Sequence, residues 1–143
     1  FDVWPSGVMT TPTLHGTRPG GAIAGAWAVL QHLGQSGYRE CVEKVIRSRE
    51  QIEAGAAQLD FTPVGAPVLG LTALTHESKD VMAIADGMAG RGWVSSRTGK
   101  PPAIHLMLSP AHSEFTGDYL ADLAIETALA GDRTDAAAVG QYA

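Results

Sequence analysis

Apolar residues recur at helical spacing in the first half of the chain, and this pattern predicts two consecutive helices. Ile23, Trp27 and Leu30 share one face of the first helix together with Ala26, and Gly34 is suited to end that helix. Ser36 can cap the second helix, which we expect to extend to about residue 60. Its apolar positions are Val42, Val45, Ile46, Ile52, Ala56 and Leu59.

The pattern changes after residue 60, where prolines and glycines interrupt the sequence. Residues 68–75 are rich in apolar and β-branched side chains and predict a strand. A helix should follow, starting at Ser78 or Asp80 and ending near Gly90 and Gly92.

Two further short strands are predicted at 93–96 and 103–108, with a turn between them. Ser113 can start a last helix that ends at Gly131. The residues expected to face inward on this helix are Phe115, Leu120, Leu123, Ala124 and Thr127.

The order β-α-β-β-α from residue 61 favours an α/β fold with a small antiparallel or mixed sheet and helices on one face. We therefore divide the chain into four parts with different expected roles. These are an irregular loop at 1–21, bridging helices at 22–60, a small α/β domain at 61–131 and a tail at 132–143.

Composition narrows the classes of function. The 143 residues are 45% hydrophobic and 17% charged, which is typical of a globular domain, and the net charge of −5 argues against a nucleic-acid partner. The single cysteine, Cys41, lies in a helical pattern and excludes an internal disulfide, which favours a reducing, cytoplasmic location. The chain starts at Phe1 without a basic leader or methionine, so we expect it to be a piece of a longer protein.

The loop before the first helix has the composition of an anion site. Thr17 offers a hydroxyl, Arg18 a guanidinium, and Gly16 and Gly20 allow close approach of the backbone. The helix that follows supplies free N–H groups at its N-terminus. A loop that only turns a corner and caps the helix would have a similar composition.

A specific sequence resemblance favours the anion site. Trp4 to Gly20 reads WPSGVMTTPTLHGTRPG and resembles the signature loop of sphingosine-1-phosphate lyases, which occurs in looser form in group II pyridoxal-phosphate (PLP) decarboxylases. The likeness continues, in order and with matching spacing, through Ala26-Trp27, Leu33-Gly34-x-x-Gly37-Tyr38, Gly90-Arg91-Gly92-Trp93 and Pro101-Pro102-x-Ile104-His105.

This resemblance implies the C-terminal part of a PLP enzyme of fold type I, the aspartate-aminotransferase type, working as a homodimer. It implies that the loop contacts the cofactor phosphate through Thr17, where the family has serine, flanked by Gly16 and Arg18. Thr10 and His15 would border the substrate. His15 stands where the family usually has a small residue, and Met9 and Ser6 also depart from its pattern, so the substrate is less determined than the cofactor.

The lysine that holds PLP as a Schiff base in this family is not recognisable in the chain. Lys44, Lys79 and Lys100 all lack the required sequence context, and no catalytic residue is assigned. We expect an upstream segment of the same enzyme to supply the lysine, and the chain to be inactive without it. The five histidines are scattered without the spacing of a metal site.

The resemblance therefore implies a lyase that acts on a small amino substrate, with PLP as the electron sink. In the lyase branch a phosphorylated long-chain base is cleaved by a retro-aldol step to an aldehyde and phosphoethanolamine. A PLP-dependent amino-acid decarboxylase, of the glutamate or tyrosine type, is the alternative within the same family. A non-catalytic α/β interaction module is the alternative from another class.

Overall fold

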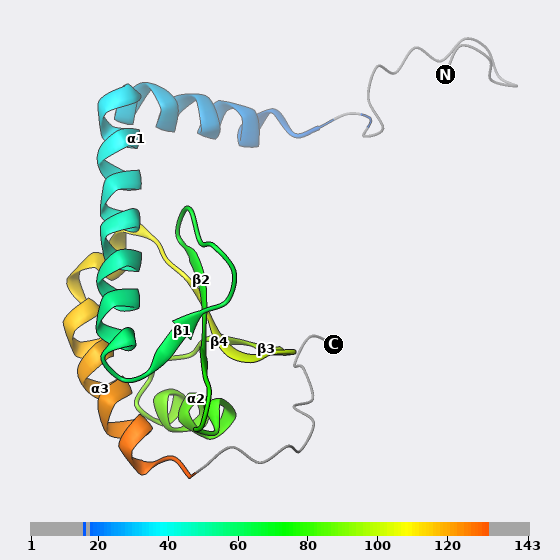
Figure 1. Ribbon diagram of the computed structural model, residues 1–143. Coiled ribbons are helices and arrows are strands. Elements are labelled where there is room, and N and C mark those ends of the chain that lie inside the picture. The colour runs from blue at the N-terminus through cyan, green and yellow to red at the C-terminus, as the bar shows by residue number, and fades with distance from the viewer. Residues whose placement is uncertain (1–15, 17, 132–143) are drawn as a thin grey trace, which may run out of the picture. The chain divides into compact units, whose positions relative to one another are not determined.

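The computed structural model describes Gly16 and residues 18–131, which form three α-helices, a short 3-10 helix and four strands (Figure 1). The chain divides into two compact units, residues 1–38 and 39–143, which are considered separately below. No helix among the described residues is both long enough and apolar enough to cross a membrane.

Helix α1, Gly20–Ala57, consists of two helical stretches that meet at Gly34. Gly34 has φ 59° and ψ −173°, a backbone conformation that is essentially restricted to glycine. The predicted break between two helices is therefore confirmed. The second stretch ends at Ala57, slightly before the expected residue 60, because the next three N–H groups bond back in tight turns and Asp60 adopts a positive φ of 61°.

Four strands form one antiparallel sheet in the order β1-β2-β4-β3. The strands are β1 Phe61–Pro63, β2 Leu71–His76, β3 Ser96–Gly99 and β4 Pro102–Met107. β2 and β4 match the predicted strands within a few residues. The α/β class with a small antiparallel sheet is thus confirmed.

Two details of the predicted sheet were wrong. Strand β1 was not expected, because it is three residues long and contains Pro63. Pro63 is tolerated because β1 is an edge strand, where a missing N–H donor need not break the ladder. Strand β3 lies three residues later than predicted, since Arg97 pairs with Ile104 and Thr98 with Ala103, leaving only Lys100 and Pro101 between the strands.

Two further helices complete the unit, α2 at Val81–Gly90 and α3 at Thr116–Leu129. Asp80, one of the two predicted starts, is the N-cap of α2. A 3-10 helix η1, Pro110–Glu114, precedes α3, so the helix begins three residues after the predicted Ser113.

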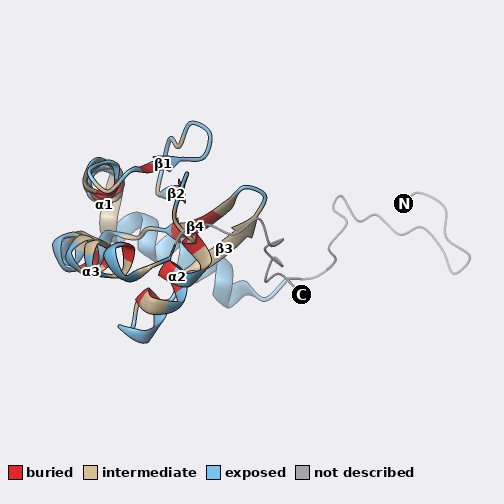
Figure 2. Cartoon of the chain, turned by 60° about the horizontal axis from the view of Figure 1, so that its bottom comes forward, coloured by how far each residue is buried: buried red, intermediate tan, exposed pale blue. Residues whose placement is uncertain are grey.

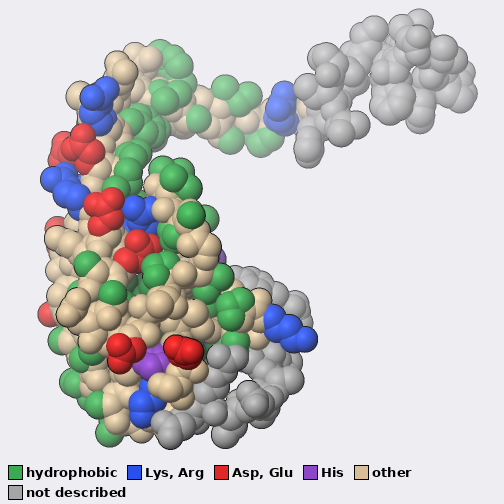
Figure 3. Space-filling model, viewed as in Figure 1, with side chains coloured by type: hydrophobic (Ala, Val, Ile, Leu, Met, Phe, Trp, Pro, Cys, Tyr) green, Lys and Arg blue, Asp and Glu red, His purple; other side chains and the backbone are tan. Residues whose placement is uncertain are grey.

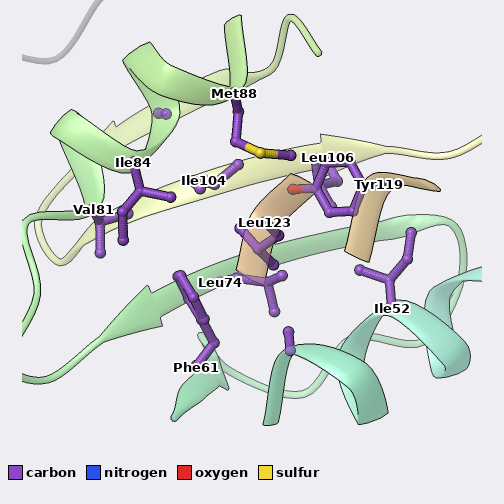
Figure 4. Packing of buried hydrophobic residues seen from close by; sticks show 12 residues of the cluster. Ile52, Phe61, Leu74, Val81, Ile84, Met88, Ile104, Leu106, Tyr119 and Leu123 are labelled. Carbon is purple, nitrogen blue, oxygen red and sulfur yellow. The ribbon is translucent and has the colours of Figure 1, made fainter. Parts of the chain in front are cut away.

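All three helices bury side chains against the sheet in one core (Figure 4). Successive side chains of a strand point to opposite faces of the sheet. Leu74 on β2 pairs with Ile104 on β4, and Leu106 lies two residues further along, so these three buried side chains share one face. The helices cover that face with Ile52 and Ala56 of α1, Ile84 and Met88 of α2, and Tyr119 and Leu123 of α3. Leu123 and Thr127 are buried, as predicted. Phe115 was expected to face inward but is half-exposed, and Tyr119, which was not among the predicted inward residues, is buried instead.

The first stretch of α1 buries none of its apolar residues within its own unit. Every residue from 18 to 32 is exposed, and this stretch is pale blue throughout in Figure 2. The predicted apolar face is present in the sequence, but the described chain does not cover it.

Candidate functional site

The predicted anion-binding loop is described in part. Gly16 and Arg18 are described and exposed, whereas Thr10, His15 and Thr17 lie outside the described residues. Helix α1 begins at Gly20, two residues after Arg18. The described residues therefore lead directly into the N-terminus of α1, where the first N–H groups have no acceptor within the helix.

The described glycines near Arg18 have open space beside them. A side chain built at Gly16, Gly20 or Gly21 would meet no atom within 4 Å. The guanidinium of Arg18 makes no hydrogen bond or ion pair with the described part of the chain. A cationic side chain beside free N–H groups at a helix N-terminus suits an anion. The described residues thus fit the phosphate end of PLP.

The lysines do not fit the Schiff-base end. Lys44 is exposed on α1 and its Nζ lies 2.9 Å from Oε1 of Glu40, a hydrogen-bonded carboxylate that raises the pKa of Lys44. A lysine nucleophile needs the opposite shift, because only the neutral amine attacks. Lys79 donates from Nζ to the carbonyl of Ala130 at 3.1 Å, and Lys100 lies exposed in the β3–β4 turn.

A second feature lies in the unit of residues 39–143, where a cavity of about 530 Å³ opens beside β4. Its walls include His105 and Met107 of β4, His112 of η1, and Trp93 and Tyr119. None of its lining residues is aspartate, glutamate, lysine or arginine. No local sequence pattern indicated this cavity, because its walls come from separate segments between residues 52 and 119.

The aromatic wall of the cavity is held by defined contacts. The Nε1 of Trp93 donates to Oδ2 of Asp122 at 2.8 Å, and the rings of Trp93 and Tyr119 meet edge to face at 5.4 Å. Arg91 also donates to Asp122, at 3.0 Å, and to Glu126. These bonds join the end of α2 to α3 and keep the indole in place.

The histidines of the cavity do not form a metal site. Among the described residues, no group of three or more His, Cys, Asp or Glu side chains could hold a metal ion. The Nδ1 of His112 accepts the backbone N–H of Ser109 at 2.7 Å, so this ring caps η1. The cavity therefore offers neither a metal site among the described residues nor a lysine or arginine to pair with a phosphate.

Known proteins resemble the chain over most of its length, although no family model matches it. It is 31% identical to the sphingosine-1-phosphate lyase of Arabidopsis thaliana over 130 residues, which are 89% of this chain and 24% of that protein. It is 34% identical to a probable L-tyrosine/L-aspartate decarboxylase of Methanothermobacter thermautotrophicus over 98 residues, or 68% of this chain and 27% of that protein.

A solved structure agrees with these relatives. The sphingosine-1-phosphate lyase of Burkholderia pseudomallei superposes with a TM-score of 0.81 and 27% identity, over 91% of this chain and 30% of that one. The chain spans about a quarter of the length of the curated relatives it matches. It is therefore homologous, over most of its length, to a portion of the sphingosine-1-phosphate lyases and their decarboxylase relatives, which are PLP-dependent lyases.

Proposed function

We propose that this chain is the C-terminal portion of a PLP-dependent carbon–carbon lyase that cleaves a phosphorylated long-chain base. The observation that carries the proposal is the likeness to sphingosine-1-phosphate lyases, which extends over about nine-tenths of the chain in both sequence and fold. In this reaction the bond between C2 and C3 breaks. The C3 hydroxyl gives up its proton as the long-chain aldehyde forms, and C2 gains a proton to give phosphoethanolamine.

When bound, PLP supplies the electron sink that makes this bond cleavage possible. We propose that the chain's own part is to hold the phosphate of the cofactor. Thr17 would donate its hydroxyl to a phosphate oxygen, Gly16 would let the backbone approach, and Arg18 would fix the loop. Thr10 and His15 would border the substrate. This assignment is supported by Arg18, which is exposed and has no hydrogen bond or ion pair with the described residues, and by the helix start two residues later.

We further propose a homodimeric, cytoplasmic enzyme whose lysine is supplied by a segment upstream of this chain. In that arrangement residues 1–21 form the cofactor and dimer-interface loop, residues 22–60 bridge, and residues 61–131 form the small domain. The positions of Lys44, Lys79 and Lys100 support a lysine from elsewhere, since two are bonded to other groups and the third lies in a turn.

The second candidate function is an amino-acid decarboxylase. It is favoured by the 34% identity to a probable L-tyrosine/L-aspartate decarboxylase. The two activities differ in their products. A decarboxylase releases carbon dioxide from tyrosine, aspartate or glutamate, whereas the lyase releases an aldehyde and phosphoethanolamine from sphinganine 1-phosphate.

The test is to assay the complete enzyme, containing this chain and the PLP lysine, with each of these substrates. Release of phosphoethanolamine supports the lyase. Release of carbon dioxide alone identifies the decarboxylase. Absence of a PLP absorption band after the cofactor is added would contradict both activities and favour the interaction module.

Thr17 provides a residue-level test in the same protein. Thr17→Val removes the hydroxyl at nearly constant size, and should weaken PLP binding by about tenfold to a hundredfold, as expected for loss of a hydrogen bond to a charged group. Thr17→Ser keeps the hydroxyl and should bind PLP almost as tightly as the unchanged protein. Equal PLP affinity in both variants would remove Thr17 from the cofactor site.

A further inference from the structure

The first stretch of α1 is unusual because it carries no charge. Between Arg18 and Arg39 the sequence contains no aspartate, glutamate, lysine or arginine. Figure 3 shows hydrophobic side chains along this stretch. Residues 20–33 are called the uncharged helix below. A helix without a charged face is normally buried on all sides, because water would otherwise meet apolar surface all around it.

The two opposite faces of the uncharged helix differ in the size of their side chains. Ile23, Trp27 and Leu30, at positions i, i+4 and i+7, form a bulky face on which each side chain is more than half exposed. The opposite face carries Gly21, Gly25 and Ala28 at the same spacing.

The face of small residues is suited to close contact. A Cβ atom at Gly21 or Gly25 would meet nothing within 4 Å. Glycine is unfavourable in a helix interior and is commonly retained where another backbone approaches closely. Both faces are therefore uncovered by the described part of the chain. The bulky face suits large apolar partners, and the small face suits an element at short range.

We propose that the uncharged helix is an interface, buried on both faces by the part of the enzyme that carries the PLP lysine. Naming this partner rests on the proposed function. The relatives are about four times longer than the stretch they share with this chain, so most of such an enzyme lies outside it. A two-fold contact with a second copy would cover one face and leave the other in water. Enclosure by a larger domain covers both.

Burial of the uncharged helix would also position the loop that precedes it. The uncharged helix starts two residues after Arg18, so a domain that encloses it fixes the N-terminus of the helix and the adjoining loop. The candidate phosphate-binding residues would then be held against the same partner that provides the lysine. Association with the lysine-bearing part would therefore also fix residues 16–20, and cofactor binding would depend on that association.

The experiment is to combine this chain with the PLP-lysine-bearing part of the enzyme from the same source and to measure their affinity by titration. Trp27→Glu places a charge on the bulky face and Ala28→Glu places one on the small face. Leu129→Glu on α3 is the matched control, since Leu129 is 72% exposed and Trp27 is 65% exposed. Circular dichroism of each variant chain checks that its helix content is unchanged.

We expect Trp27→Glu and Ala28→Glu each to weaken the association by at least about tenfold, as substitutions at the centre of an interface do. Leu129→Glu should associate like the unchanged chain. An effect of Trp27→Glu without an effect of Ala28→Glu would overturn burial on both faces. A homodimer of this chain alone that Trp27→Glu disrupts, with the affinity for the lysine-bearing part unchanged, would assign the surface to a second copy. Failure of the unchanged chain to associate would also overturn the proposal.

The PLP absorption band is recorded separately on the assembled protein, so that two different failures can be told apart. An assembly that is sensitive to both variants but binds no PLP would reject the lyase and keep the interface. An assembly that binds PLP and is insensitive to both variants would reject the interface and keep the lyase.

Discussion

Asp80 illustrates how one side chain defines the start of an element. Its Oδ1 accepts the backbone N–H groups of Met82 at 2.9 Å and Ala83 at 3.2 Å, which would otherwise lack acceptors. We expect Asp80→Ala to lower the free energy of unfolding by about 1 kcal/mol.

Urea denaturation of the purified chain measures this change. Glu77→Ala is the control, because Glu77 is exposed and makes no hydrogen bond or ion pair with the described residues. An Asp80→Ala variant as stable as Glu77→Ala would show that the cap contributes nothing to stability.

Tyr119 is a buried phenol whose hydroxyl finds no hydrogen-bond partner among the described residues. Burial raises the pKa of Tyr119 above its ordinary value, since the charged phenolate is poorly solvated there. The folded state therefore keeps a proton that the unfolded state releases above about pH 10. Stability from this group is complete below that pH and is lost as the pH rises further.

Tyr119→Phe should remove this loss of folding stability at high pH. It should also stabilise the chain by about 1 kcal/mol at pH 7, because an unpaired hydroxyl no longer has to be buried. The measurement is urea unfolding at pH 7 and at about pH 10.5. Tyr38→Phe is the control, as Tyr38 is exposed. A loss of stability in Tyr119→Phe at neutral pH would mean that the hydroxyl has a partner.

At the scale of elements, Arg49 connects α1 to the segment before β2. Its Nη1 donates to the carbonyl of Pro67 at 2.6 Å, and its Nε lies 3.7 Å from the carboxylate of Glu53. Both side chains are largely buried. We expect Arg49→Ala to destabilise the chain by about 3 kcal/mol, because it leaves a buried carboxylate without its cation.

The double variant Arg49→Met with Glu53→Leu should recover most of that loss, since no buried charge remains. Denaturant unfolding compares the two, with Arg47→Ala as the control. Arg47 is exposed and its pair with Glu43 is 3.8 Å long, so its removal should have little effect. If Arg49→Ala were as mild as Arg47→Ala, the ion pair would not stabilise this connection.

At the scale of the whole chain, the two units differ in how far their described apolar side chains are buried. The unit of residues 39–143 has a core to which the sheet and the three α-helices contribute, whereas the uncharged helix has no covering within the described chain. A free helix of this length is marginal in water. Amide hydrogen exchange of the isolated chain should therefore be fast at residues 20–33 and slow in β2 and β4.

Addition of the PLP-lysine-bearing part should then slow exchange at residues 20–33. Mass spectrometry of peptides from both samples measures this directly. Slow exchange at residues 20–33 in the isolated chain would show that the chain itself covers the helix.

Local interactions made part of this fold predictable from sequence. The break at Gly34, the cap at Asp80 and the helices α1 and α2 depend on neighbours a few residues away, so their signals lie within short windows of sequence. The candidate cofactor residues Gly16, Thr17 and Arg18 came from a resemblance to known enzymes and not from spacing alone.

Other features depend on residues far apart in the chain, and only the tertiary structure decided them. The short strand β1 exists because β2 offers it a partner, and β3 extends to Gly99 because β4 pairs with it. Tyr119 is buried because α3 packs on the sheet, and the cavity beside β4 is made of side chains from several elements. The sequence by itself determined the break at Gly34, the cap at Asp80 and the uncharged surface of residues 20–33. Pairing register, the inward face of α3 and the cavity required the packed chain, because strand pairing and burial are interactions between segments that no local pattern encodes.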